Sequence, residues 1–254
     1  MAALGLPVLV ALAVLGLVAG VGITAIGPGG VLATIGLFAL TGLSPAQVAG
    51  TAIATHVATG LAGTAAYTRS GQLRDGETRR TAGILAVTAA VGTPLGVLVN
   101  TAVSGQAFGV LLGMFVAAVA GLVWYRERRA APERRSHPGP ASVAALGSAV
   151  AAVSGIFGVG GPMLTVPLLV ALGVPVLESL AAAQAQSVVI AGVGTLGYLA
   201  HGAIDWPLAA LVGVPELVGV LAGWVVARAL PTRVLKCALV TSLFALAPYL
   251  ALHG

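Results

Sequence analysis

Charged residues are scarce in this chain: Asp, Glu, Lys and Arg make up 7% of its 254 residues. Soluble globular proteins carry about 25% of such residues, whereas 58% of this chain is hydrophobic. The mean hydropathy is +1.05, and apolar runs follow one another almost from end to end. This composition excludes a soluble domain with a single anchor and predicts an all-α polytopic membrane protein.

Cysteine is nearly absent as well, since Cys237 is the only one. A single cysteine excludes a disulfide within the chain. The sequence also lacks Cys/His metal-binding spacings, a phosphate-binding Walker loop and a credible catalytic triad. We therefore expect no enzymatic activity, no cofactor and no metal site.

The apolar sequence is interrupted by clusters of glycine, proline and charged residues. These interruptions divide the chain into ten apolar segments. These are residues 3–26, 29–43, 47–68, 80–103, 106–125, 142–157, 161–173, 177–199, 206–227 and 232–252. Segments 29–43 and 161–173 are shorter than the ~20 residues that a helix needs to cross a bilayer. We expect these two segments to form tilted half-spans or re-entrant hairpins. Both possibilities predict the same membrane side for the ends of the other segments.

The basic residues test this count of ten. They are Arg69, Arg74, Arg79, Arg80, Arg126, Arg128, Arg129, Arg134, Arg135, Arg228, Arg233 and Lys236. With five segments in each half, all twelve lie on one side, which the positive-inside rule makes the cytoplasm. Both termini are then predicted to be extracytoplasmic. The same rule accounts for the net charge of +5, so we expect contact with membrane lipid and no binding of nucleic acid.

The two halves of the chain resemble each other. Residues 27–71 and 158–202 match at 13 of 45 positions at a constant offset of 131, which indicates an internal repeat. Because each half has an odd number of segments, the halves are predicted to be inverted, as in many secondary transporters. The expected organisation is a repeat at 1–125, a basic cytoplasmic linker at 126–141 and a second repeat at 142–254.

Each repeat carries a glycine cluster inside its apolar sequence. The clusters consist of Gly27, Gly29 and Gly30 in the first half and Gly158, Gly160 and Gly161 in the second. A helix that restarts after such a break presents free N–H groups and about +0.5 charge at its N-terminus. Two such ends near the midplane are predicted to form an anion site. The alternative is that the glycines only permit close helix packing.

Polar side chains lie at a similar depth in both halves. Thr51, Thr55 and Thr59 share one helix face, which His56 borders. The aligned stretch of the second half contains Gln184, Gln186 and Ser187. Together with the glycine clusters, these residues except Thr59 form the candidate substrate-binding set, although an interhelical hydrogen bond would explain each Thr or Gln singly.

Glu216 is the only carboxylate well inside a predicted span. Ionisable groups are costly in a membrane and are functional candidates by default. Glu216 and His56 are therefore candidates for proton coupling, with a structural role for Glu216 as the alternative. Tyr67 and Tyr198 match in the repeat and are expected to be interfacial anchors.

The run from Gly155 to Leu169 resembles the signature of the TauE/SafE family of sulfite and organosulfonate permeases, approximately GxxGxGGGxxxxPxL. The sequence keeps Pro167 and Leu168 but has Pro162 where a third glycine is usual. The first half resembles the paired motif more loosely, with Gly36 where proline is common. The resemblance covers essentially the whole chain and implies a bacterial inner-membrane permease for a small sulfur-containing anion.

The function expected from these observations is alternating-access transport of sulfite or an organosulfonate. With a negative cytoplasm, export of one negative charge is favoured by about 2.3 kcal/mol per 100 mV, so an exporter needs no coupled ion whereas an importer does. An anion channel, a carrier of small carboxylates and a non-transporting membrane subunit are the alternatives. The sequence leaves open whether the protein forms a homodimer.

Overall fold

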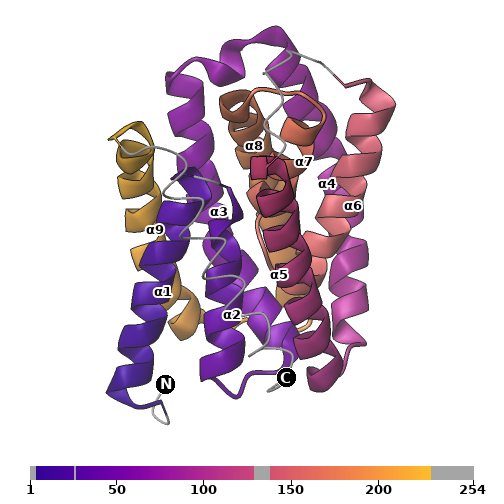
Figure 1. The fold of residues 1–254 in the computed structure, drawn as a ribbon. Helices are drawn as coiled ribbons and strands as arrows, with labels where there is room; N and C mark the ends of the chain where they lie inside the picture. The colour runs from indigo at the N-terminus through magenta and orange to yellow at the C-terminus, as the bar shows by residue number, and fades with distance from the viewer. Residues whose placement is uncertain (1–3, 26, 129–137, 230–254) are drawn as a thin grey trace.

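The computed structural model describes residues 4–25, 27–128 and 138–229. Within these ranges the chain forms nine α-helices and two short 3₁₀ helices and contains no strand (Figure 1). The helices are α1 (Leu6–Ala25), α2 (Val31–Leu40), α3 (Pro45–Arg69), α4 (Gly76–Thr101), α5 (Gly105–Arg128), α6 (Pro140–Phe157), α7 (Pro162–Ala171), α8 (Val176–Ala200) and α9 (Trp206–Ala229). The 3₁₀ helices are η1 (Pro28–Gly30) and η2 (Gln72–Arg74). The predicted segment 232–252 and most of the linker lie outside the described residues.

Six helices are long and apolar enough to cross a bilayer: α1, α4, α5, α6, α8 and α9. Large apolar side chains are exposed on the outer helices, for example Val87 and Val91 on α4 and Val214 and Val218 on α9. A soluble protein would bury such rows of side chains, whereas lipid solvates them. The expected all-α, multi-pass membrane architecture is confirmed for the described part of the chain.

Helices α2 and α7 have 10 residues each, which gives a length of about 15 Å and therefore only half of a bilayer core. They correspond to the two short segments that the sequence predicts. The third segment forms α3, a helix of 25 residues that is rich in threonine. Polar residues of α3 face inward, where Thr51, Thr59 and His56 are buried, so α3 lies in the centre of the protein.

Glycine allows two pairs of helices to approach closely. Helix α1 packs along α9, and α4 packs along α6. A Cβ atom added to Gly20 would lie 1.9 Å from the backbone oxygen of Glu216, and one added to Gly96 would lie 2.0 Å from that of Ala152. Small residues at membrane helix interfaces permit such backbone contact. Between these pairs, α3 and α8 pack antiparallel, because Gly50 lies beside Tyr198 and Gly63 beside Gln184.

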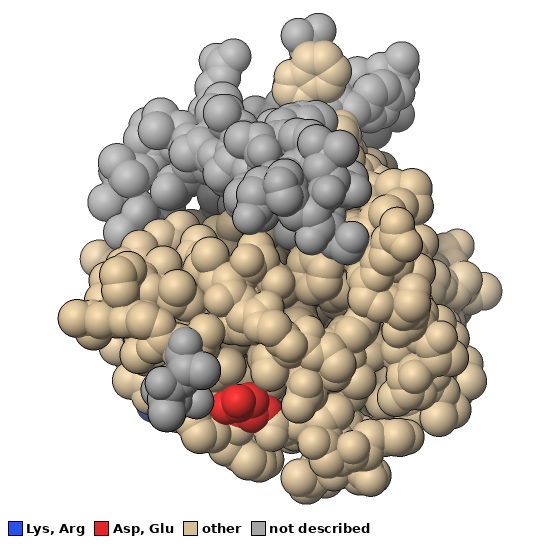
Figure 2. Space-filling view, turned by 90° about the horizontal axis from the view of Figure 1, so that it is seen from below, with Lys and Arg blue, Asp and Glu red and all other residues tan. Residues whose placement is uncertain are grey.

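Charge is concentrated at one end of the molecule. Arg69, Arg74, Arg79 and Arg80 lie around the connection between α3 and α4, at the upper end of Figure 1. Figure 2 shows the opposite end, where the described surface is almost entirely uncharged apart from one acidic patch and a small edge of blue to its left. The described basic residues therefore follow the one-sided distribution that the sequence predicts.

Replacing Gly20 by alanine tests the close contact of α1 with α9. The added methyl group would overlap the backbone of Glu216, and overpacking of this kind costs about 1–3 kcal/mol. We expect a clear fall in the melting temperature of the detergent-purified protein. Gly83→Ala on α4 is the matched control, because a Cβ there meets nothing within 4 Å. Equal melting temperatures for the two variants would contradict the packing described here.

Candidate functional site

Both glycine clusters interrupt the helical backbone. After α1, Gly27 takes a φ of 106°, and after α6, Gly158 takes a φ of 68°. Side chains disfavour positive φ, so these two aligned positions require glycine for their backbone conformation. The 3₁₀ turn η1 and the helix α2 follow the first break, and α7 follows the second, with Pro162 at its first position.

The two breaks meet in the interior. A Cβ atom added to Gly27 would lie 3.0 Å from the carbonyl oxygen of Pro162, which places η1 directly against the beginning of α7. The free N–H groups of two half-length helices therefore lie in one region of the protein. Gly29 instead packs against Gly22 of α1, so this glycine allows close packing between neighbouring segments.

His56 of α3 lies between the two glycine clusters. A Cβ on Gly30 would be 2.6 Å from the Nε2 atom of His56, and one on Gly160 would be 3.1 Å from its Cδ2 atom. Only hydrogen atoms on these two α-carbons leave room for the imidazole. His56 is one of the few titratable residues in the described spans, and it is buried, with 1% of its surface exposed.

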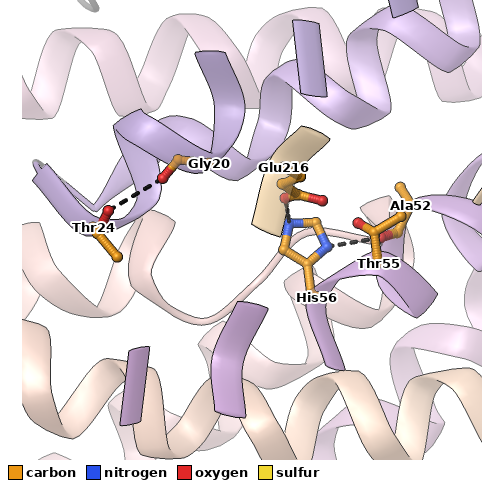
Figure 3. Close-up of polar contacts among 6 residues, drawn as sticks. All are labelled: Gly20, Thr24, Ala52, Thr55, His56 and Glu216. Atoms are coloured by element: carbon orange, nitrogen blue, oxygen red, sulfur yellow. Dashed lines mark hydrogen bonds and ion pairs between the residues drawn. The ribbon is translucent and has the colours of Figure 1, made fainter. Parts of the chain in front are cut away.

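Glu216 approaches His56 from α9. Its Oε1 atom is 3.3 Å from Nε2 of His56, and the glutamate is 0% exposed (Figure 3). The other ring nitrogen, Nδ1, lies 2.7 Å from the carbonyl oxygen of Ala52. The Thr55 hydroxyl lies beside the carboxylate but donates to the same carbonyl at 2.8 Å. The two proton-coupling candidates are thus one buried pair formed by helices from different halves of the sequence.

The second half contributes polar groups to the same region. A Cβ on Gly160 would be 2.9 Å from the Ser187 hydroxyl, and one on Gly161 would be 3.2 Å from Oε1 of Gln186. Gln186 accepts a hydrogen bond from Thr165 and donates one to the carbonyl of Gly147. Ser187 therefore borders the histidine, while Gln186 is already held by neighbours on α7 and α6.

Two predicted residues lie elsewhere. The Thr51 hydroxyl accepts a hydrogen bond of 2.9 Å from the backbone N–H of Asp205, which ties α3 to the start of α9. Gln184 is buried against Gly63 in the α3–α8 contact, and neither atom of its amide has a hydrogen-bond partner. Thr34 of α2 likewise has a buried hydroxyl without a hydrogen-bond partner.

The expected interfacial role of Tyr67 and Tyr198 is wrong. Both side chains are buried, and each donates a hydrogen bond to the helix that precedes a glycine break. Tyr67 bonds the carbonyl of Thr24 at 3.3 Å, and Tyr198 bonds that of Gly155 at 2.6 Å. A tyrosine near the end of a membrane helix can point inward when a backbone carbonyl near the end of another helix lacks a hydrogen-bond donor.

The candidate site is closed to both faces of the protein. His56, Glu216 and Ser187 are each no more than 2% exposed. Among the described residues, no group of three or more His, Cys, Asp or Glu side chains could hold a metal ion. Besides the Glu216 carboxylate, the site contains two helix N-termini, the Ser187 hydroxyl and one imidazole, and helix N-termini favour negatively charged groups.

The fold and this buried polar centre define a polytopic helical membrane protein. The family described as "Sulfite exporter TauE/SafE" matches residues 12–250, and the chain belongs to this family. A protein of Xylella fastidiosa (strain 9a5c) named "Probable membrane transporter protein" is 30% identical over 213 residues, which cover 82% of this chain and 78% of that protein. A second one, from strain Temecula1 / ATCC 700964, is 29% identical over 159 residues, 61% of this chain and 59% of its own. No solved structure matches the chain.

Replacing Tyr198 by phenylalanine tests the hydrogen bond that holds the end of α6. The substitution leaves the carbonyl of Gly155 without this donor, and an unsatisfied buried group costs about 1–3 kcal/mol. We expect a lower melting temperature, with a smaller decrease for Tyr67→Phe, whose hydrogen bond is longer. An equal or larger decrease for Tyr67→Phe would contradict this ranking.

Proposed function

We propose that this protein is a secondary transporter that carries a small sulfur-containing anion, such as sulfite or an organosulfonate, by alternating access. The observation that carries the proposal is the meeting of both glycine breaks at His56. Membership of the TauE/SafE family supports transport as the activity and sulfur oxyanions as the substrate class. The names of the Xylella proteins support transport without specifying a substrate.

Anion binding is supported by the charges around the site. The first turns of α2 and α7 each contribute partial positive charge. Protonated His56 would present a full positive charge to an anion that takes the place of the Glu216 carboxylate, which now faces it at 3.3 Å. The described spans place no lysine or arginine beside His56; the arginines lie at helix ends such as Arg69. A compact group with several oxygens can accept hydrogen bonds from backbone N–H groups that converge from two directions.

An inverted repeat is supported by the correspondence of the helices. Adding 131 to the bounds of α2 and α3 gives the bounds of α7 and α8. The same shift relates the Tyr67 bond to the Tyr198 bond, and it relates the Gly63–Gln184 contact to the Ile53–Gly194 contact. Because α3 and α8 run antiparallel, the two repeats are oppositely oriented with respect to the membrane.

Two observations support alternating access: the site is closed, and it lies between two closely packed pairs of helices. Helix α1 packs with α9 and α4 with α6, each through glycine contacts, and α3 and α8 lie between them. We propose that relative rocking of these pairs exposes the site first to one face and then to the other. The arginine-rich end faces the cytoplasm of a bacterial cell, with this protein in the inner membrane and its termini outside the cytoplasm.

Crowding the glycine breaks tests the proposed anion site. Gly30→Ala and Gly160→Ala place a methyl group against His56, and we expect at least a tenfold loss of affinity for sulfite or sulfoacetate. Binding is measured by calorimetry and thermal shift on purified protein, with acetate and chloride as competing candidates. Gly42→Ala, just after α2, is the control because a Cβ there meets nothing within 4 Å.

The outcomes separate the candidate functions. Selective stabilisation by a sulfur oxyanion that is lost only in the two crowded variants supports the proposal. Stabilisation by acetate alone points to a carrier of small carboxylates. If no anion stabilises the folded wild-type protein, the glycine clusters act only in packing and the proposed function fails.

A further inference from the structure

The hydrogen bonds of His56 fix the position of one proton. Nδ1 lies 2.7 Å from the carbonyl oxygen of Ala52, and a carbonyl can only accept, so Nδ1 must carry a hydrogen. The remaining ring nitrogen, Nε2, faces Oε1 of Glu216 at 3.3 Å. An unprotonated Nε2 facing an ionised carboxylate would bring two acceptors together with no donor between them.

One further proton must therefore lie between His56 and Glu216. It is bound either to Nε2, which gives an imidazolium beside a carboxylate, or to the carboxyl group, which gives two neutral side chains. The pair has zero net charge in both arrangements. This agrees with its complete burial, because an uncompensated buried charge is strongly unfavourable.

Among the described residues, no other ionisable side chain is placed to replace either partner. Helices α1, α2 and α7, which pack around the glycine breaks, contain no Asp, Glu, Lys, Arg or His. On the remaining neighbours, Arg69 ends α3 and Glu178 lies in the first turn of α8. His201 follows α8, Asp205 precedes α9, and Arg228 lies in the last turn of α9. All of these lie at helix ends, away from the mid-helix positions of His56 and Glu216.

We propose that Glu216 is an internal anion that occupies the partner position of His56 until substrate displaces it, so that each monovalent anion binds together with one proton. The inference rests on the proposed anion site. In the closed state the glutamate is the group that faces Nε2 of His56, and His56 lies between the two glycine clusters. An incoming anion takes this place against an imidazolium that is protonated on both nitrogens.

The charge balance sets the stoichiometry. Before binding, the pair contains the Nδ1 hydrogen and one shared proton. After binding, the shared proton is on Nε2, where it pairs with the substrate, and the displaced carboxylate is buried without a cation. Glu216 therefore takes up a proton from solution. The closed site is therefore neutral both before and after the anion binds. The anion and the proton cross the membrane as an electroneutral pair.

This coupling has a direct consequence for pH dependence. Because the bound state holds one more proton than the free state, affinity for a fixed-charge anion should rise as pH falls, approaching tenfold per pH unit. It also allows a proton gradient directed into the cell to drive uptake against the membrane potential, which an uncoupled anion carrier cannot do. Reversal of the gradient drives export by the same site.

The test measures binding of methanesulfonate, a probe whose charge stays at −1 at every pH used, to the full-length protein in detergent. Calorimetry in two buffers of different ionisation enthalpy gives the number of protons taken up. We expect about one proton per anion for wild type. His56→Gln should reduce this number to near zero, because the lone buried carboxyl group stays neutral in both states.

His201→Gln is the matched control for His56→Gln. His201 makes the same contact to the carbonyl oxygen four residues earlier, at 2.9 Å, but it is exposed to solvent and lies after α8. Proton uptake should remain at about one in this control. Melting temperatures establish that each variant is folded.

The Glu216→Gln variant tests whether Glu216 competes with the substrate for His56, or instead acts as a structural partner of His56 or as a ligand of the substrate. The amide keeps the shape of the side chain but not its charge, so we expect methanesulfonate to bind at least tenfold more tightly than to wild type. Asp205→Asn, at the start of α9, removes a carboxylate outside the site and should leave affinity unchanged. If the Glu216→Gln variant does not fold, the number of protons taken up by the wild-type protein still tests whether anion binding is coupled to proton binding.

The results distinguish this inference from the function on which it rests. Methanesulfonate binding without proton uptake, or weaker binding in a folded Glu216→Gln variant, overturns the coupling but leaves the anion site in place. If neither the wild type nor Glu216→Gln binds methanesulfonate, sulfite or sulfoacetate, the proposed function itself fails. Uptake of one proton together with tighter binding in Glu216→Gln supports both.

Discussion

The structure depends on one constraint: a polar group inside a membrane protein must find its partner within the protein. Lipid offers no hydrogen bonds, so an interrupted helix or a buried polar side chain is stabilised by a partner inside the protein. Tyr198 supplies a donor to the carbonyl of Gly155, and Thr51 accepts from the backbone of Asp205. His56 and Glu216, two ionisable groups on helices that are distant in sequence, face each other at 3.3 Å in the interior.

Glycine makes this arrangement possible in three different ways. At Gly27 it permits a positive φ, at Gly20 it permits contact between helix backbones, and at Gly30 it leaves space for an imidazole. The same residue type therefore breaks a helix, joins two helices and shapes a site. The two interpretations of the glycine clusters, binding and packing, are consequently not exclusive, since Gly29 packs on Gly22 while its neighbour borders His56.

Periodicity and hydropathy predict the helices well because lipid imposes a uniform requirement along each span. The bounds of the described helices follow the predicted segments within a few residues, including the half-length α2 and α7. Polar side chains are harder to assign, because a threonine on an inward face can bind substrate, a neighbouring helix or its own backbone. Thr51 bonds α9 and Thr55 bonds its own helix, and the sequence offers no means to distinguish these outcomes.

The sequence by itself determined the membrane class, the helical segments that the structure describes, and the repeat at an offset of 131. Each of these can be read along the chain as composition or as a period. Only the tertiary structure decided which residues meet. His56 and Glu216 are 160 positions apart, and their contact depends on α9 packing along both α1 and α3. Pairing across such a separation is set by helix packing, which leaves no local pattern in the amino-acid sequence.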